Sequence, residues 1–296
     1  PTTPRPPRPS SSPSSWARLL LSARAERNRR AQGVGSKVLE LGTRKTLEHD
    51  IVVNSQRPLR STVGKPWYSY YVLKTNGIFQ SQEEINNYKW TDPNTGLTNL
   101  IQPNAKPGDL RYVDFNNDSK INSDDNQYMG SYMPKITFGF GGNLNYKNLD
   151  FSFQFQGVGK STIYNAFKQM TLTGRQQGGN MLKDILNAWD YNHTSGIPRL
   201  ALVDDPNGNY TNPSDFYLED GSYLRLKNLT LGYTLPQQWL NALGLKKSTL
   251  RLYFNCENLF TITDYTGIDP EVGNFGLDGG VYPVARSFTI GFNFGF

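Results

Sequence analysis

Oxygen-bearing side chains recur at short intervals between residues 114 and 125, and their spacing could support metal chemistry. Counted from Asp114 as position 1, they occupy positions 1, 3, 5, 9 and 12, and position 8 is apolar. A calcium loop of the EF-hand or dockerin type spaces its ligands in this way, because a hard cation needs many oxygens from one short segment. The expected ligands are five side chains and one main-chain carbonyl (that of Lys120): Asp114, Asn116, Asp118, Lys120, Asn122 and Asp125.

Two positions of this loop depart from the calcium pattern. Position 6, where a glycine usually makes the sharp turn, is Ser119, and position 12 is Asp125 in place of the longer glutamate. The alternative is an Asx-rich turn that holds no metal, because Asp and Asn side chains readily bond to their own backbone. In both cases the loop is expected to be structural. The protein is expected to require no cofactor, although the loop suggests that it can bind calcium.

The residue types that enzymes use most often are scarce or unpaired in this chain. It contains only two histidines, His49 and His193, so zinc or Ser-His-Asp chemistry lacks candidates. Cys256 is the only cysteine, which excludes an internal disulfide and predicts a small apolar side chain on a strand. The spacing pairs none of the acidic residues that a hydrolase would need, namely Asp204, Asp205, Glu219 and Asp220. The sequence therefore predicts that the protein is not an enzyme.

The excess positive charge lies in the first 33 residues. They hold seven arginines and one glutamate, which equals the net charge of +6 of the whole chain, so residues 34–296 sum to zero. Nucleic acid is therefore not an expected partner. Residues 1–15 are a Pro/Ser tract that cannot build a core, and residues 16–31 predict a short basic helix that fits a signal peptide poorly. We expect residues 1–33 to be a disordered basic tail that is foreign to the fold. Residues 34–296 are expected to form the folded domain.

The elements that must position the acidic loop are β-strands. Apolar and polar residues alternate along residues 135–156, interrupted only at residues 147–148. A two-residue turn there would place Tyr146 opposite Leu149 on one apolar face. Each arm is close to the roughly 9–11 residues that a tilted strand needs to cross a bilayer. The opposite face carries Asp150 and glutamines, which is too polar for a protein core but suits a water-filled lumen.

Residues 287–296 alternate strictly between large apolar side chains and small or polar ones. A soluble sandwich would bury the apolar face against a second sheet, whereas an outer-membrane barrel would turn it to lipid. The chain stops on an aromatic residue while the pattern still runs, which favours the barrel. The spacing is also similar to the terminal assembly signal of bacterial outer-membrane barrels, which is expected at Thr289, Gly291, Phe294 and Phe296.

Other elements are expected along the chain. Strands are predicted at 36–42, 50–54, 64–73, 223–233 and 249–256. The apolar parity of 223–233 switches between Leu226 and Leu229, which a bulge near residues 227–228 would explain. Short helices are predicted at 81–87, 180–189 and 236–245, and loops at 91–108 and over most of 157–221.

Five segments occur in a fixed order along the chain: GIFQS (77–81), PGDLRYVDFNND (107–118), GSYMPKITFGF (130–140), YLRLKNLTLGYTLP (223–236) and NLFTITDYTGIDPE (258–271). Together they resemble the TonB-linked outer-membrane transporters of the SusC/RagA type from Bacteroidota. The resemblance runs over residues 36–296 and covers the C-terminal part of such proteins.

The resemblance implies an all-β fold, namely an antiparallel transmembrane β-barrel portion, the C-terminal part of a barrel of roughly 22 strands that an N-terminal domain plugs. It implies import of glycans or peptides delivered by a SusD-like surface lipoprotein and powered through the TonB complex. It also implies assembly by the barrel assembly machinery and contact with lipid in the outer membrane of a Gram-negative, Bacteroidota-like cell. The plug and the TonB-contacting segment are absent here. The strands predicted in this chain are too few to close a barrel as wide as that of such transporters. The chain is therefore not expected to transport on its own.

A different class of protein fits part of the same pattern. A secreted soluble β-protein could use a calcium-stabilised loop to bind a glycan or another protein. Such a protein would bury Phe138, Phe153 and Phe292 together inside one compact sandwich. The sequence does not name a substrate.

Overall fold

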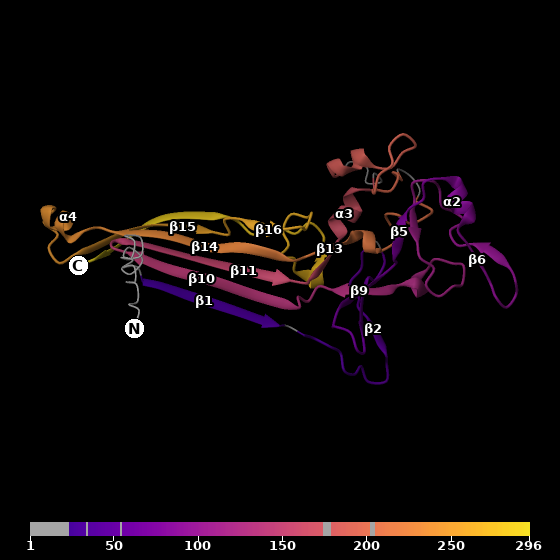
Figure 1. Ribbon diagram of the computed structural model, residues 1–296, viewed down its shortest axis with the longest axis horizontal. Coiled ribbons are helices and arrows are strands. Elements are labelled where there is room, and N and C mark those ends of the chain that lie inside the picture. Colours follow the sequence, from indigo (N-terminus) through magenta and orange to yellow (C-terminus); the bar gives the residue numbers. More distant parts are fainter. Residues whose placement is uncertain (1–23, 34, 54, 174–178, 202–204) are drawn as a thin grey trace, which may run out of the picture.

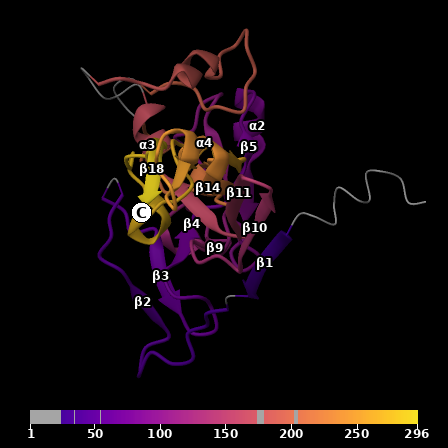
Figure 2. The same ribbon diagram turned by 90° about the vertical axis from the view of Figure 1, so that its left-hand side faces the viewer.

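The computed structural model describes residues 24–33, 35–53, 55–173, 179–201 and 205–296. Long strands run side by side through one half of the molecule, and short sheets with helices α2 (Gln82–Asn87) and α3 (Ala166–Thr171) gather at their far end (Figure 1). In the view turned by 90°, the short elements lie on both sides of the long strands. Strands β2 (Thr46–Glu48) and β3 (Leu59–Thr62) lie opposite the two helices (Figure 2). The molecule thus has a sheet half and a loop half.

The sheet half is built around the hairpin that the alternation predicts. Strands β10 (Ile136–Tyr146) and β11 (Leu149–Gly159) pair antiparallel, with Tyr146 opposite Leu149. Lys147 adopts a left-handed φ of 54° in the connecting turn, as tight hairpin turns require. The predicted turn and its register are confirmed.

Three further long strands extend this hairpin. They are β14 (Tyr223–Thr234), β15 (Thr249–Glu257) and β18 (Ser287–Gly295), and within the described residues the sheet has the order β1-β10-β11-β14-β15-β18, with β16 (Thr261–Thr263) also paired to β14. The register between β11 and β14 shifts at Gln154 and Phe155, which leaves Lys227 as the extra residue. This is the predicted bulge, and it explains why the apolar parity of β14 switches.

The register joins side chains of one kind into rows that cross all five long strands from β10 to β18. One apolar row consists of Leu144, Phe151, Leu231, Phe254 and Ile290. The adjacent row, on the opposite face, is polar and consists of Asn143, Ser152, Thr230, Asn255 and Thr289. Because successive residues of a strand point to opposite faces, the sheet has one apolar and one polar face.

The apolar face is exposed in the described part of the chain. Ile290 is 85% exposed, Phe292 69% and Leu231 48%. These values exclude a sandwich in which the apolar face packs against a second sheet as a dry core. The soluble alternative therefore lacks the burial that it requires.

The loop half consists of short strands with small cores of their own. A four-stranded sheet has the order β2-β3-β4-β9, with β4 at Ser69–Val72 and β9 at Gln127–Ser131. A three-stranded sheet has the order β13-β12-β17, at Leu218–Asp220, Thr162–Asn165 and Leu277–Asp278. Two strand pairs complete it, β5 (Thr75–Ile78) with β8 (Leu110–Tyr112) and β6 (Lys89–Thr91) with β7 (Thr98–Leu100).

Tyrosines fill the main core of the loop half. Tyr70, Tyr164 and Tyr217 are fully buried in one cluster. Each hydroxyl donates a hydrogen bond, from Tyr70 to the Gly276 carbonyl at 2.9 Å and from Tyr217 to the Asn209 carbonyl at 2.8 Å; that of Tyr164 reaches a glutamine side chain. These bonds offset the cost of burying the hydroxyls, so bulky tyrosines can serve as core residues.

The helices are short, as predicted. Ser81 caps α2 by accepting a hydrogen bond from the Glu84 N–H at 3.2 Å, and α4 spans Gln237–Ala242 at the turn end of the sheet (Figure 1). The helix expected at 180–189 is a 3-10 turn over Lys183–Asn187, and α3 is not predicted. Among the described residues no helix is long and apolar enough to cross a membrane.

The helix predicted at 16–31 is wrong where its residues are described, and residues 24–33 are not an unpaired tail. They form β1 (Arg24–Gly33), antiparallel to β10, while residues 1–23 lie outside the described part of the chain. Free backbone groups at the edge of β10 accept any extended segment, which explains the pairing. The register runs from Arg24 opposite Asn145 to Gly33 opposite Ile136. That residues 1–33 are foreign to the fold stays a prediction.

The short strands are predicted poorly. Segments 36–42 and 50–54 contain only isolated bridges, and β4 occupies only part of segment 64–73. The loops predicted at 91–108 and 157–221 hold β6, β7, β12, β13 and α3. Such strands are too short for alternation to be recognised, and packing rather than local propensity fixes them.

Candidate functional site

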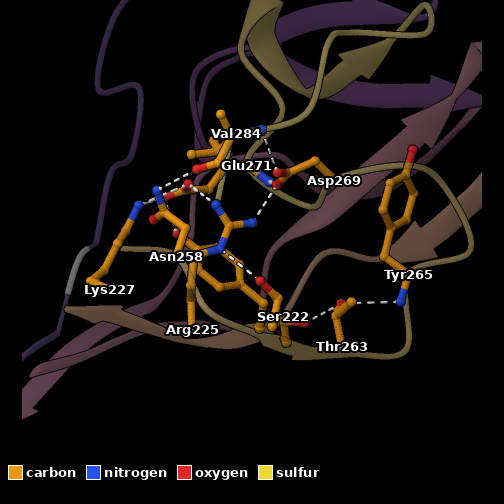
Figure 3. Close-up of polar contacts among 12 residues, drawn as sticks. Ser222, Arg225, Lys227, Asn258, Thr263, Tyr265, Asp269, Glu271 and Val284 are labelled. Carbon is orange, nitrogen blue, oxygen red and sulfur yellow. Dashed lines mark hydrogen bonds and ion pairs between the residues drawn. The ribbon is translucent and has the colours of Figure 1, made fainter. Parts of the chain in front are cut away.

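A cluster of charged side chains lies where β14 begins, and Arg225 is its centre (Figure 3). Arg225 is 2% exposed, and its guanidinium donates through Nη2 to Asp269 Oδ1 at 2.6 Å and through Nη1 to Glu271. Its Nε donates to Thr261 Oγ1 at 2.7 Å. All three nitrogens of a buried cation are therefore satisfied, as a buried charge requires.

Lys227 and Tyr223 complete the cluster from the same strand. Lys227 Nζ lies 3.0 Å from both carboxylate oxygens of Glu271 (Figure 3). The Tyr223 hydroxyl donates to Glu271 Oε1 at 2.8 Å. Arg225 and Lys227 are two residues apart, so strand alternation places them on one side of the sheet, and the bulge at Lys227 shifts the parity only of the residues that follow it. The charge cluster therefore lies directly beside the predicted bulge.

The carboxylates of the cluster belong to the loop that joins β16 to β18. Asp269 accepts hydrogen bonds from the N–H of Glu271 at 2.8 Å and from the N–H of Val284 at 3.0 Å. Asn258, just after β15, donates to the Ala285 carbonyl at 3.0 Å. The cluster therefore fixes both ends of residues 264–286 against the sheet.

The ionisation of Asp269 makes this attachment depend on pH. Burial by itself would raise the pKa of the carboxyl, but the Glu271 N–H, the Arg225 guanidinium and the Val284 N–H outweigh it and hold the pKa below its ordinary value. Because folding lowers this pKa, the ionised carboxylate stabilises the folded chain fully at any pH above the ordinary pKa of an aspartate. That stability is lost as the pH falls through the lowered pKa of Asp269. We expect residues 264–286 to become protease-sensitive only in that acidic range, as cleavage by an acid-active protease would measure.

The variant Asp269→Asn tests this dependence at neutral pH. The substitution removes the charge but keeps the shape of the side chain. A protease should therefore cleave residues 264–286 of the variant at neutral pH, as it cleaves them in the wild type only at acidic pH. Asp264→Asn is the matched control, because Asp264 is exposed in the same loop. Equal protease resistance of both variants would contradict the role of Asp269.

The polar face of the sheet holds a second ion pair, between Asp150 on β11 and Arg251 on β15. Arg251 Nη2 lies 2.6 Å from Asp150 Oδ2, and Nε donates to Oδ1 at 2.9 Å. The pair crosses β14 above Gly232, where a Cβ would come within 2.4 Å of the carboxylate. This residue must therefore be glycine, because any side chain there would displace the pair.

A cavity of about 960 Å³ lies at the junction of the two halves. It is lined by β9, by Pro134 and Lys135 just before β10, and by β13. Charged residues of both signs line it, namely Lys135, Lys160, Asp215, Glu219 and Asp220.

The six predicted calcium ligands lie in one loop that internal hydrogen bonds close. Asp125 is fully buried and accepts from the N–H groups of Phe115 at 2.8 Å and Asn122 at 2.9 Å, and Asp114 accepts from the Ser119 N–H at 2.9 Å. Asn116 and Asp118 likewise accept backbone N–H bonds. In the described residues no group of three or more His, Cys, Asp or Glu side chains is placed to hold a metal.

Ser119 adopts the backbone conformation that calcium loops usually reserve for glycine. Its φ is 65°, in the left-handed region that is costly for a residue with a Cβ. The sharp turn is therefore made without glycine. Calcium binding by this loop stays a prediction.

The residues predicted as the assembly signal lie on β18 and just after it. Gly291 faces Tyr253, and a Cβ there would come within 2.5 Å of the tyrosine ring. Phe294 and Phe296 have ring centroids 6.1 Å apart, both are exposed, and Thr289 pairs with Asn255. Their role in assembly stays a prediction.

Of the four acidic residues weighed for a hydrolase, the three in the described chain have separate partners, that of Asp220 being Ser222. Asp204 lies outside the described residues, and Asp205 accepts hydrogen bonds from the N–H groups of Asn209 and Tyr210. Glu219 pairs with Lys168 at 3.1 Å. Cys256 is buried in the apolar row between Leu229 and Phe288, as a small apolar side chain.

Sequence patterns alone do not select Arg225, Asp269 or Glu271 as site residues. One signal could have identified them: charged residues occupy alternate positions of an otherwise apolar strand. Burial of such a charge is costly unless a partner of opposite charge exists. That partner is an Asp-Pro-Glu run more than forty residues later. Pairing over this separation follows from the fold alone.

Relatives with curated names match most of the chain, whereas no model of a protein family matches it. "TonB-dependent receptor P26" of Formosa agariphila is 35% identical over 274 residues, which cover 87% of this chain and 26% of that protein. "TonB-dependent receptor SusC" of Bacteroides thetaiotaomicron is 30% identical over 197 residues, 67% of this chain and 18% of that protein. The chain thus spans about a quarter or less of the length of these relatives.

Solved structures share the fold. The structure described as the RagAB peptide transporter aligns with a TM-score of 0.68 and 22% identity, covering 92% of this chain and 27% of that one. A RagAB peptide importer in the closed-closed state aligns with a TM-score of 0.61 and 25% identity. The sheet half and the loop half therefore occur together in known importers.

Proposed function

Because this chain belongs to the SusC/RagA type of TonB-dependent receptors, we propose that it forms part of the wall and of the outer loops of an outer-membrane importer. The observation that carries the proposal is the alternation of rows across the long sheet. Ile290, in an apolar row, is 85% exposed, and the adjacent row on the other face is polar. An importer wall needs this arrangement, with lipid on one side and a water-filled lumen on the other.

The proposed substrate is a glycan or a peptide that the protein binds and conducts without catalysis. The charged cavity at the loop end and the Asp150–Arg251 pair on the polar face would line its path. A SusD-like surface lipoprotein would deliver the substrate to the loop half. The TonB complex would supply energy through parts of the receptor that lie outside this chain, and the barrel assembly machinery would insert it among outer-membrane lipids.

Alone, the chain would not be transport-competent. The long sheet has two edges, at β1 and β18, that do not pair with each other in the described residues. Unpaired edges are costly in lipid because backbone groups there find no hydrogen-bond partner. The calcium proposal is separate and structural: an ion at residues 114–125 would stiffen a loop that internal hydrogen bonds already close.

Membrane association tests the proposed function directly. The full chain, refolded in the presence of liposomes, is expected to float with them in a density gradient and to resist extraction at alkaline pH. A secreted soluble protein would remain at the bottom of the gradient. Flotation that is lost on washing would contradict the wall assignment.

Transport by the isolated chain is expected to be absent. Liposomes that carry the chain should show no saturable uptake of labelled oligosaccharides or peptides, since two sheet edges stay open. The control is a complete receptor of the same type in matched liposomes. Saturable uptake by the isolated chain would overturn the proposal that it is only part of the importer.

A further inference from the structure

The turn end of the long sheet carries an exposed apolar surface. The last apolar row there consists of Leu235, Leu250 and Phe294, because Phe294 pairs with Leu250 and the Leu235 N–H donates to the Leu250 carbonyl at 2.8 Å. From Leu235 the chain passes directly into α4, at the far end of the long strands (Figure 1). There Trp239 is 57% exposed and Leu243, just after the helix, is 71% exposed. An exposed apolar surface therefore follows on the last row of the sheet.

Helix α4 is short but amphipathic. Leu240 is buried, whereas Trp239 and Leu243 are four residues apart and so share another face. On the polar side Gln237 Nε2 donates to Asn241 Oδ1 at 3.1 Å. A tryptophan can bury its ring in the interfacial layer of a bilayer while its N–H stays in contact with water. The helix thus has the composition of a segment that lies at the surface of a membrane.

Cations without acidic partners surround this apolar surface. Lys246 and Lys247 follow α4, and Lys147 lies in the turn between β10 and β11 at the same end of the sheet. All three are exposed, and none of them forms an ion pair within the described residues. The connector from β14 to β15 contains no acidic residue, and the nearby carboxylate of Asp150 is already paired with Arg251. The turn end therefore has a surplus of positive charge.

Charge and polarity together select the class of partner. A soluble anion such as phosphate would pair with the lysines but would leave Trp239 and Leu243 in water. An apolar protein surface would cover those two side chains but would meet the ammonium groups without anions. An anionic phospholipid satisfies both, because its acyl chains meet the apolar side chains while its phosphate meets the ammonium groups at the ends of flexible lysine stems.

We propose that the connector from β14 to β15 anchors the turn end of the sheet at a bilayer surface and selects anionic phospholipid headgroups there. Trp239 and Leu243 would enter the interfacial layer, and Lys147, Lys246 and Lys247 would contact lipid phosphates. The proposal rests on the wall assignment for the position of the bilayer. It adds a preference for one class of lipid, which an apolar sheet face does not require.

Quenching of tryptophan fluorescence by brominated lipid tests the proposal. The full chain is reconstituted in liposomes with equal fractions of phosphatidylglycerol and phosphatidylcholine, and only one of the two lipids is brominated. The chain has five tryptophans, so the signal of Trp239 is taken as the difference between the wild type and Trp239→Phe. Brominated phosphatidylglycerol should quench this signal more strongly, because each lysine that contacts an anionic headgroup enriches such lipid roughly fivefold.

The double variant Lys246→Gln with Lys247→Gln tests the role of the cations. It should remove most of the preference, so that the two brominated lipids quench Trp239 nearly alike. Arg44→Gln with Lys45→Gln is the matched control, because it removes two adjacent exposed cations from the loop half. The control should quench like the wild type. Salt at about 1 M should weaken the wild-type preference, since it screens exposed charges beyond roughly 3 Å.

Four outcomes would overturn the lipid anchor. They are equal quenching by the two lipids in a wild-type chain that floats with liposomes, a preference that the lysine variant retains, a preference that the control variant also loses, and a preference that inorganic phosphate abolishes at constant ionic strength. The last outcome would assign the cations to a soluble anion.

Failure of the anchor and failure of the wall assignment give different results. If the chain floats and resists alkaline extraction but shows no lipid preference, the anchor fails and the wall assignment stands. If the chain binds phosphatidylglycerol vesicles through Lys246 and Lys247 but is released at alkaline pH, the anchor stands and the wall assignment fails.

Discussion

Replacing Arg225 with methionine is expected to cost about 3–5 kcal/mol of unfolding free energy, the usual loss when one partner of a buried ion pair is removed. The guanidinium is 3% exposed and contacts the carboxylates of Asp269 and Glu271, which are 11% and 22% exposed. Without it the partly buried carboxylate of Asp269 loses its cation, and Glu271 keeps only Lys227. Urea unfolding of the reconstituted chain, followed by tryptophan fluorescence, measures the loss.

The matched control is Arg57→Met. Arg57 forms an ion pair of 3.1 Å with Asp50, but both side chains are exposed, at 51% and 94%. An exposed pair contributes roughly 0–1 kcal/mol, so this variant should unfold almost as the wild type does. Equal losses in the two variants would show that the buried cluster does not hold the loop. Arg225→Lys should remain destabilised, because one ammonium cannot replace three directed nitrogens.

Replacing Phe292 with lysine is expected to cost about 2–4 kcal/mol of insertion free energy if the residue faces the middle of a bilayer. Phe292 pairs with Leu252 in an apolar row and is 69% exposed. A charge at this position would have to leave water for acyl chains. The fraction of chain that floats with liposomes at increasing urea concentration measures the effect.

The control for this variant must place the same charge on the opposite face. Asn293→Lys would do so, but Asn293 pairs with Arg251, and two cations opposite each other repel. Thr289→Lys is the cleaner control, since Thr289 pairs with Asn255. It should insert nearly as well as the wild type. Insertion that falls equally in both variants would contradict the assignment of the two faces.

The charged cluster gives the loop half a defined position. Residues 264–286 are attached to Arg225 of β14 through Asp269 and Glu271, and the Val284 N–H donates to Asp269. In an importer of the proposed kind, a loop held at both ends would keep its shape while a partner bound. In such an importer the cluster would link the stability of the wall to the presentation of the outer surface.

The long strands were predictable from sequence because their alternation is long and strict. The turn after Tyr146, the register that pairs it with Leu149 and the bulge at Lys227 all follow from matching apolar parity across neighbouring strands. A slip of one residue would move each apolar row to the polar face. The pattern therefore fixes both the pairing and the faces.

The loop half was not predictable for the opposite reason. Its strands are short, and its cores consist of tyrosines such as Tyr70 and Tyr217 that sequence patterns place at a surface as readily as inside. The ion pairs of Arg225 join segments more than forty residues apart. The pairing of β1 with β10 arises from backbone groups, which leave no trace in side-chain type.

The central claim is that the apolar face of the long sheet meets lipid and the polar face meets water. Spin labels placed singly at residues 288–293 in a Cys256→Ala chain, reconstituted in liposomes, test it by accessibility to oxygen and to a water-soluble nickel complex. Cys256 is the only native cysteine, so each label is unique. The account predicts high oxygen accessibility at 288, 290 and 292 and high nickel accessibility at 289, 291 and 293. Equal accessibility at neighbouring residues, or the inverse alternation, would contradict it.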